Sequence, residues 1–200
     1  MDARSLGFGM SFDAVLCPYS LITYMRTSDD VRRLFEQIAS VLPRGGLAVL
    51  VMDSRKDARA ASAGAILVTR LMQRGCAGVI TDGGFRDSAE IAALGFPAYH
   101  HRPSAPTNLT LHQAIEINVP IGCGDAPVFP GDVILGDSDG VIVIPAHLAD
   151  EIADETVEMT AFEDFVTEEV RKGRSILGLY PATDEQTLRD FAAWRAANGR

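Results

Sequence analysis

Two adjacent charged residues, Arg86 and Asp87, follow a short apolar run and a pair of glycines in "VITDGGFRDSAEI", residues 79–91. Strands that end at glycine turns are common places for binding residues. Arg86 carries the planar fork that binds a carboxylate. Asp87 offers oxygens to a hard divalent cation whose remaining positions are filled by water. The pair is also typical of a surface ion pair after a turn, or of Asp87 acting as a helix N-cap.

A second candidate is the backbone of Gly64, Ala65, Ile66 and Leu67, at the start of a predicted helix. The free N–H groups at a helix start attract anions. The alternative is a helix that enters beneath a sheet, with the small residues 58–63 allowing close packing. Adjacent residues on a strand point to opposite faces, so His100 and His101 are expected to have structural or solvent-exposed roles. Residues 122–132 are glycine-rich, but they lack the spacing of a phosphate loop and indicate a turn.

Short apolar runs and amphipathic segments are expected to place these residues around one sheet. Helices are predicted from residue 64 to 75 and over 87–95, and the glycines Gly75 and Gly95 end them. A helical C-terminal region follows, in which an acidic face opposes six apolar residues: Leu148, Ile152, Val157, Phe162, Phe165 and Val170. Strands are predicted at residues 47–53, 76–81, 96–102, 116–123 and, on both sides of an Asp-Ser-Asp-Gly turn, 132–145.

The composition restricts the class of protein. The chain has 200 residues, 47% of them hydrophobic and 22% charged, as in an ordinary globular protein. A net charge of -9 argues against a nucleic-acid surface, which needs clustered Lys and Arg. The three cysteines have no paired short spacing and indicate neither a disulfide framework nor a zinc site. Without a signal peptide or a membrane-spanning apolar run, we expect a cytoplasmic protein.

Several ordered motifs resemble the RraA-like family, which includes the regulator of ribonuclease activity A and the metal-dependent 4-hydroxy-4-methyl-2-oxoglutarate aldolases. The motifs are "GAILVTRLMQRGCAGVITDGGFRD", "FPAYHHRPSAP" and "INVPIGCGDAPVFPGDVILGDSDGVIVIP", and the resemblance covers about residues 49–200. It implies an α/β fold of the swivelling β/β/α type over residues 47–200 and a homotrimer or hexamer.

The resemblance also implies roles for individual residues. In the aldolases, the arginine that matches Arg86 binds the carboxylate of pyruvate, and the aspartate that matches Asp87 holds Mg²⁺ or Mn²⁺. The backbone that matches Gly64 to Leu67 lines the same pocket. Cleavage of a carbon–carbon bond beside a 2-keto acid leaves a pyruvate enolate, and positive groups on its oxygens stabilise the developing charge. Oxaloacetate decarboxylation passes through the same enolate.

Two features depart from the family pattern. The aldolases usually carry an acidic residue at the position of Ala65, so retro-aldol activity would need Asp82, Asp125 or another carboxylate instead. Residues 1–46, with residues 47–52 after them, resemble a strand–helix–strand fragment of a class I S-adenosylmethionine-dependent methyltransferase that lacks the glycine-rich cofactor loop. This atypical N-terminal segment suggests a fusion or a junction. The alternative function is a non-catalytic regulator that binds a ribonuclease or another protein partner.

Overall fold

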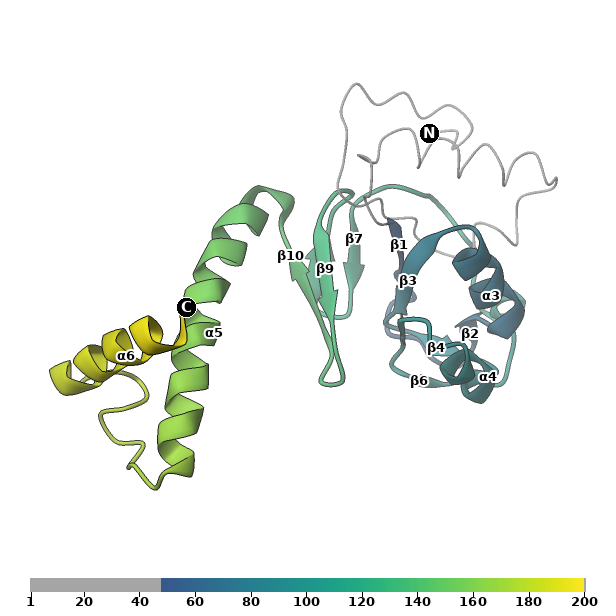
Figure 1. Ribbon diagram of the computed structural model, residues 1–200. Coiled ribbons are helices and arrows are strands. Elements are labelled where there is room, and N and C mark those ends of the chain that lie inside the picture. The colour runs from purple at the N-terminus through teal and green to yellow at the C-terminus, as the bar shows by residue number, and fades with distance from the viewer. Residues whose placement is uncertain (1–47, 200) are drawn as a thin grey trace. The chain divides into compact units, whose positions relative to one another are not determined.

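The computed structural model of the protein describes residues 48–199 (Figure 1). The atypical N-terminal segment predicted for residues 1–46 lies outside these residues. The chain divides into two compact units, Met1–Ala146 and His147–Arg200. The described residues have a mixed α/β fold that ends in two long helices.

The first unit contains two three-stranded parallel sheets with matching strand orders, β1-β3-β5 and β2-β4-β6. Each strand of the first sheet is followed in the chain by the corresponding strand of the second. The first sheet consists of β1 (Ala48–Met52), β3 (Cys76–Thr81) and β5 (Ala98–Tyr99). The second consists of β2 (Ala61–Ala63), β4 (Gly84–Phe85) and β6 (Arg102–Pro103).

The prediction of one sheet is therefore wrong, and the reason lies at the glycine pair. β3 ends at Thr81, and the chain turns at Gly83 before Gly84 and Phe85 pair with β2 instead of extending β3. A side chain at Gly83 would come within 2.6 Å of the Ser54 Cβ atom and 2.7 Å of the Ser62 Oγ atom. Glycine thus allows the close approach of the segments that join the two sheets.

Helix α3 (Ala65–Gln73) connects β2 to β3, and α4 (Ser88–Ala93) connects β4 to β5, which confirms both predicted helices. The helices lie beside one another against the sheets (Figure 1). Between them is a buried core that includes Met52, Val68 and Phe85, each with no exposed surface. This core fixes the start of α3 and the end of β4, the two elements that carry the candidate site.

Two antiparallel hairpins complete the first unit. β7 (Ile121–Cys123) pairs with β8 (Ala126–Val128), and β9 (Val133–Gly136) pairs with β10 (Val141–Ile144). The strands on both sides of the Asp-Ser-Asp-Gly turn are confirmed. The strand predicted for residues 116–123 is limited to Ile121–Cys123, and residues 122–132, predicted as a turn, contain β8. The inward residues of these hairpins pack around the buried Val51, Ile80 and Val128. Two short 3-10 helices, η2 (Asn108–Thr110) and η3 (Ala146–Leu148), flank this region in the sequence.

The second unit is a helical hairpin of α5 (Ala149–Arg171) and α6 (Glu185–Asn198). Phe165, Val166 and Leu179 form its buried core. The apolar face predicted for α5 is buried only in part, because the Val157 side chain is 68% exposed and Val170 is 44% exposed. The reason is that the packing partners of α5 in this unit, Phe191 and Trp194 on α6, gather around Phe162 and Phe165, and both Val157 and Val170 lie outside this cluster.

An ion-pair network lies on the surface of the second unit. Lys172 forms salt bridges with Glu168 and Glu169, and the Trp194 Nε1–H donates to Glu168 Oε2 at 2.7 Å. The hydrogen bond from Lys172, followed by that from Trp194, lowers the pKa of Glu168. Among residues 48–199, no helix combines the length and apolarity needed to cross a membrane.

Candidate functional site

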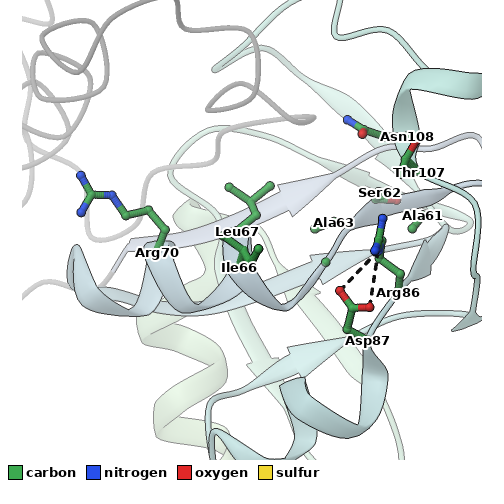
Figure 2. A pocket seen from close by; sticks show the side chains of 11 residues that line it. Ala61, Ser62, Ala63, Ile66, Leu67, Arg70, Arg86, Asp87, Thr107 and Asn108 are labelled. Atoms are coloured by element: carbon green, nitrogen blue, oxygen red, sulfur yellow. Dashed lines mark hydrogen bonds and ion pairs between the residues drawn. The ribbon is translucent and has the colours of Figure 1, made fainter.

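A pocket of about 390 Å³ lies at the first turn of α3, within the first unit (Figure 2). Segments far apart in the sequence form its wall: β2 with the start of α3, the residues after β4, and the loop before η2. The lining residues are Ala61, Ser62, Ala63, Gly64, Ile66, Leu67, Arg70, Arg86, Asp87, Thr107 and Asn108. The structure thus brings Arg86 and Asp87 together with the start of α3, whereas the roles that the resemblance implies for them stay predictions.

The pairing at the end of β4 directs the Arg86 side chain into the pocket. The Arg86 N–H donates to the Ala63 carbonyl oxygen at 3.0 Å, which continues the pairing of β4 with β2 by one residue. Phe85 is fully buried on the core side, so the alternation of a strand turns the next side chain to the opposite face. Asp87 then adopts the left-handed conformation, with φ 58° and ψ 38°, which aspartate tolerates better than most residues.

Gly64 leaves room for both charged side chains. A Cβ atom at this position would lie 2.9 Å from the Arg86 Cγ atom and 2.9 Å from the Asp87 Oδ2 atom. The backbone of Gly64 is extended, with φ -126° and ψ 176°, a conformation open to any residue. Glycine is therefore needed here for space and not for backbone freedom.

The contacts of Asp87 exclude one alternative raised by the sequence, the helix N-cap, and show another, the ion pair with Arg86. The side chain does not cap its own helix, α4. It accepts a hydrogen bond from the Ala65 N–H at the start of α3, at 3.3 Å, and forms an ion pair with the Arg86 Nε atom at 3.3 Å. Both contacts are long, and the side chains of Arg86 and Asp87 are 41% and 35% exposed, so the pair is weak and open to a ligand.

The first turn of α3 supplies further donors. The N-cap residue Gly64 has no side chain with which to cap this helix. The N–H groups of Ile66 and Leu67 belong to the first turn, where a helix provides no backbone partner. They add the positive end of the helix dipole to the cation of Arg86. The Ala65 side chain does not line the pocket, and the Ala65 N–H is engaged by Asp87.

The two carboxylates considered as replacements for the acid missing at Ala65 lie elsewhere. Asp82 is 9% exposed and accepts backbone hydrogen bonds from Ser54, Lys56 and Gly124. Asp125 forms an ion pair with Lys56. Both line a separate hollow of about 480 Å³ beside the hairpins, and neither lines the Arg86 pocket. In the part of the chain that the structure describes, neither Asp82 nor Asp125 therefore stands in for the acid missing at Ala65.

His100 and His101 follow β5 and lie outside any strand, so the alternation expected for a strand does not apply to them. The His100 ring is half-buried and stacks on Phe85 with ring centroids 5.2 Å apart, whereas His101 is exposed. Both line the hollow beside the hairpins and not the Arg86 pocket.

Burial, as the largest cause, raises the pKa of the Cys123 thiol in the same hollow to about 12. This thiol is therefore protonated and unsuited to nucleophilic chemistry.

The donor set fits some metal ions and not others. Among residues 48–199, no group of three or more His, Cys, Asp or Glu side chains is placed to hold a metal ion. A cation bound at Asp87 would therefore have one carboxylate from these residues, with water and substrate as further ligands. This suits Mg²⁺ or Mn²⁺, which keep several waters, and does not suit a zinc site built from three or four protein ligands.

The sequence did not single out three lining residues: Arg70, Thr107 and Asn108. Arg70 had a detectable signal, because it lies three and four residues after Leu67 and Ile66 and so shares their helix face. Thr107 and Asn108 follow a proline-rich loop. The Ala61 N–H donates to the Pro106 carbonyl oxygen at 2.8 Å, and this contact brings the loop to the pocket.

Comparison with known proteins gives one family. Residues 25–143 match the family model of RraA-like proteins, described as Aldolase/RraA. A protein of Halalkalibacterium halodurans, provisionally named a 4-hydroxy-4-methyl-2-oxoglutarate aldolase, is 39% identical over 97 residues, which are 48% of this chain and 46% of that protein. The chain thus spans about half the length of this curated relative.

Solved structures share the fold. An uncharacterized protein from Pseudomonas syringae matches with a TM-score of 0.67 at 19% identity, covering 85% of this chain and 76% of the other. An unusual member of the RNase ES inhibitor RraA protein family from Streptomyces coelicolor matches with a TM-score of 0.59 at 24% identity, covering 82% and 80%. Since the family model matches more than half of its residues, the chain belongs to the RraA-like family.

Proposed function

We propose that this protein is a divalent-metal-dependent carbon–carbon lyase that acts on small 2-keto acids. The observation that supports this most is the meeting of Arg86, Asp87 and the first-turn N–H groups of Ile66 and Leu67 in one pocket. A guanidinium and open backbone donors suit a carboxylate, and a half-exposed aspartate beside them suits a hydrated cation. The aldolase name of the relative from Halalkalibacterium halodurans agrees with this assignment.

In this proposal Arg86 orients the substrate. Its Nε atom faces Asp87, and its two terminal nitrogens have no partner among the described residues, so they can take the 2-keto carboxylate as a fork. The N–H groups of Ile66 and Leu67 supply further donors for the same end of the substrate. These fixed donors favour the state in which negative charge grows on the carboxyl and keto oxygens.

The reaction breaks the bond between C3 and C4 of the keto acid. The electron pair of this bond moves into C3 and the keto group and gives a pyruvate enolate, while C4 leaves as a carbonyl compound or as CO₂. A proton added to C3 then gives pyruvate. A divalent cation held by Asp87 would supply additional positive charge at the keto acid.

Ala65 changes the balance between the two reactions. Retro-aldol cleavage needs a base to remove the proton of the C4 hydroxyl, and Asp87 is the only carboxylate that lines the pocket within the described residues. Decarboxylation needs no such base, since the departing carboxylate is already ionised. We therefore expect oxaloacetate to be decarboxylated more efficiently than hydroxy-keto diacids are cleaved.

The finer architecture is part of the same proposal. We expect residues 47–200 to form the swivelling β/β/α domain of the RraA-like type, and the whole protein to assemble as a homotrimer or hexamer. Sedimentation equilibrium would measure the mass of the assembly. A monomer at micromolar concentration would contradict this part of the proposal.

The test of the activity is pyruvate release from oxaloacetate and from 4-hydroxy-4-methyl-2-oxoglutarate, with and without Mg²⁺ or Mn²⁺. Because free metal ions also decarboxylate oxaloacetate, Asp87→Asn and Arg86→Met at equal metal concentration provide the background. We expect metal-dependent release above that background, faster with oxaloacetate. Release at the background rate from both substrates, in folded protein, would overturn the proposal.

A second candidate function has one specific observation in its favour. The position of Ala65 has no acid, and neither Asp82 nor Asp125 replaces it. A non-catalytic regulator would need no such acid, and a net charge of -9 suits a basic protein partner. If pyruvate release stays at background, salt-sensitive binding of a ribonuclease would support this reading instead.

A further inference from the structure

We infer that Arg70 is a second carboxylate-binding residue of the pocket and selects keto acids that carry a carboxylate at each end. This inference rests on the proposed function, in which Arg86 holds the carboxylate next to the keto group. It adds a distal subsite on α3, formed by Arg70 with Ile66 and Leu67 between the two arginines.

Helix geometry places Arg70 on the wall of the pocket. Arg70 follows Ile66 by four residues and Leu67 by three, so the three side chains share one face of α3. Figure 2 shows Arg70 and Arg86 at opposite ends of the group, with Ile66 and Leu67 between them. All four residues line the pocket.

The length of the helix segment suits a short diacid. From Ala65 to Arg70 the helix rises by about 7.5 Å, at about 1.5 Å per residue. The two carboxyl carbons of an extended five-carbon diacid are about 5 Å apart, given carbon–carbon bonds of about 1.5 Å. Arginine side chains on both sides, with their long flexible stems, can span the remaining distance.

The charges of the pocket also favour a diacid. The lining contains two cations, Arg86 and Arg70, and a single acid, Asp87. Arg86 already pairs with Asp87, whereas the guanidinium of Arg70 forms no ion pair with any described residue. In a chain whose net charge is -9, this leaves a local positive excess that a second substrate carboxylate would neutralise.

The middle of the pocket is apolar. Ile66 is 89% exposed although it is a large aliphatic residue, and Leu67 beside it is half-buried. A substrate whose carbon chain crosses this part of α3 would cover that surface, while its two charged ends reach the arginines. A keto acid with a charged group in the middle of its chain would be disfavoured.

A purely structural role for Arg70 makes a different prediction. Arg70 lies in the last turn of α3, where a cation stabilises the negative end of the helix. Loss of that role would lower the melting temperature and would affect all ligands alike. Loss of a distal subsite would affect only ligands with a second carboxylate.

The test is calorimetric binding of two unreactive keto acids in the presence of Mg²⁺: 2-oxoglutarate, with two carboxylates, and 2-oxobutyrate, with one. Arg70→Met should weaken 2-oxoglutarate binding about 10-fold or more, since the variant loses a hydrogen bond between two charged groups. Binding of 2-oxobutyrate should change less than about 2-fold, within the spread of surface substitutions. Arg102→Met is the matched control, because Arg102 is exposed on β6 outside the pocket.

The variants distinguish failure of the proposed function from failure of the distal subsite. Arg86→Met should weaken both ligands, and failure to weaken either one overturns the proposed function. If Arg86→Met weakens both while Arg70→Met weakens neither, or both equally, then only the distal subsite is overturned. If Arg102→Met weakens 2-oxoglutarate binding as much as Arg70→Met does, the loss comes from the change in net charge, and the distal subsite is likewise overturned.

Discussion

Replacement of Gly64 by alanine tests the geometry of the candidate site most directly. The added Cβ atom would lie 2.9 Å from the Arg86 Cγ atom, 2.9 Å from the Asp87 Oδ2 atom and 3.2 Å from the Arg86 Cδ atom. Carbon atoms at optimal contact are about 3.5–4.0 Å apart, so the Arg86 Cγ atom must move by roughly half an ångström or more, and the other two atoms must give way as well. The backbone conformation itself accepts alanine without strain.

The substitution should therefore affect activity much more than stability. Arg86 and Asp87 are partly exposed and can swing away, which keeps the cost in the free energy of unfolding near the low end of overpacking, about 1 kcal/mol. The same movement displaces the carboxylate fork and the metal ligand. A displacement of about 1 Å in a catalytic site can cost about 100-fold in rate, so we expect kcat/KM for oxaloacetate to fall by about that factor.

Gly122→Ala is the matched control. Gly122 lies in β7, and a Cβ atom there meets nothing within 4 Å. Both variants should be measured by pyruvate release and by thermal unfolding. If Gly64→Ala retains the activity of the unmodified protein, the steric argument for the Arg86–Asp87 arrangement is refuted. Equal losses in both variants would show that any added methyl group disturbs the fold.

Three further predictions concern other parts of the chain. Asp82→Ala should lower the free energy of unfolding in urea by about 3 kcal/mol or more, because three backbone donors lose a charged acceptor, while Asp125→Ala at an exposed ion pair should change it by less than about 1 kcal/mol. Cys123 should resist iodoacetamide at pH 8 in the folded protein and react after unfolding, as peptide mass mapping would show, since its pKa is raised to about 12. Trp194 fluorescence should change in the acid range in which Glu168, whose pKa is lowered in the folded protein, becomes protonated. The stabilising contribution of Glu168 is thus present at neutral pH and lost in acid, and Glu168→Gln should abolish the fluorescence change.

The sequence predicted the elements that have a strong periodic signal. Apolar runs indicated β1 and β3, and helical spacing with a terminal glycine indicated α3 and α4. The second sheet was not predicted because β2, β4 and β6 have only two or three residues each and show no alternation. Such strands depend on pairing between distant segments, which local patterns do not contain.

The residues of the candidate site likewise include some that the sequence could predict and some that it could not. Arg86, Asp87 and Gly64 were candidates because each stands at a recognisable strand end or helix start, and the resemblance to the RraA-like family implied that they share one pocket. Thr107 and Asn108 could not, since they reach the pocket through a backbone hydrogen bond between Ala61 and Pro106, 45 residues further along the chain. The position of Asp82 outside the pocket could not be predicted either, because nothing in the sequence shows that its oxygens accept hydrogen bonds from backbone donors.

The hydrogen bonds of Asp82 also have a consequence for folding kinetics. The carboxylate joins segments separated by 28, 26 and 42 residues in the sequence, to Ser54, Lys56 and Gly124. Contacts that close such long loops pay a large entropy cost and tend to form late. An interaction that is absent from the transition state contributes mainly to the barrier against unfolding. We therefore expect Asp82→Ala to speed unfolding while leaving the refolding rate nearly unchanged, so that Asp82 sets the lifetime of the folded unit.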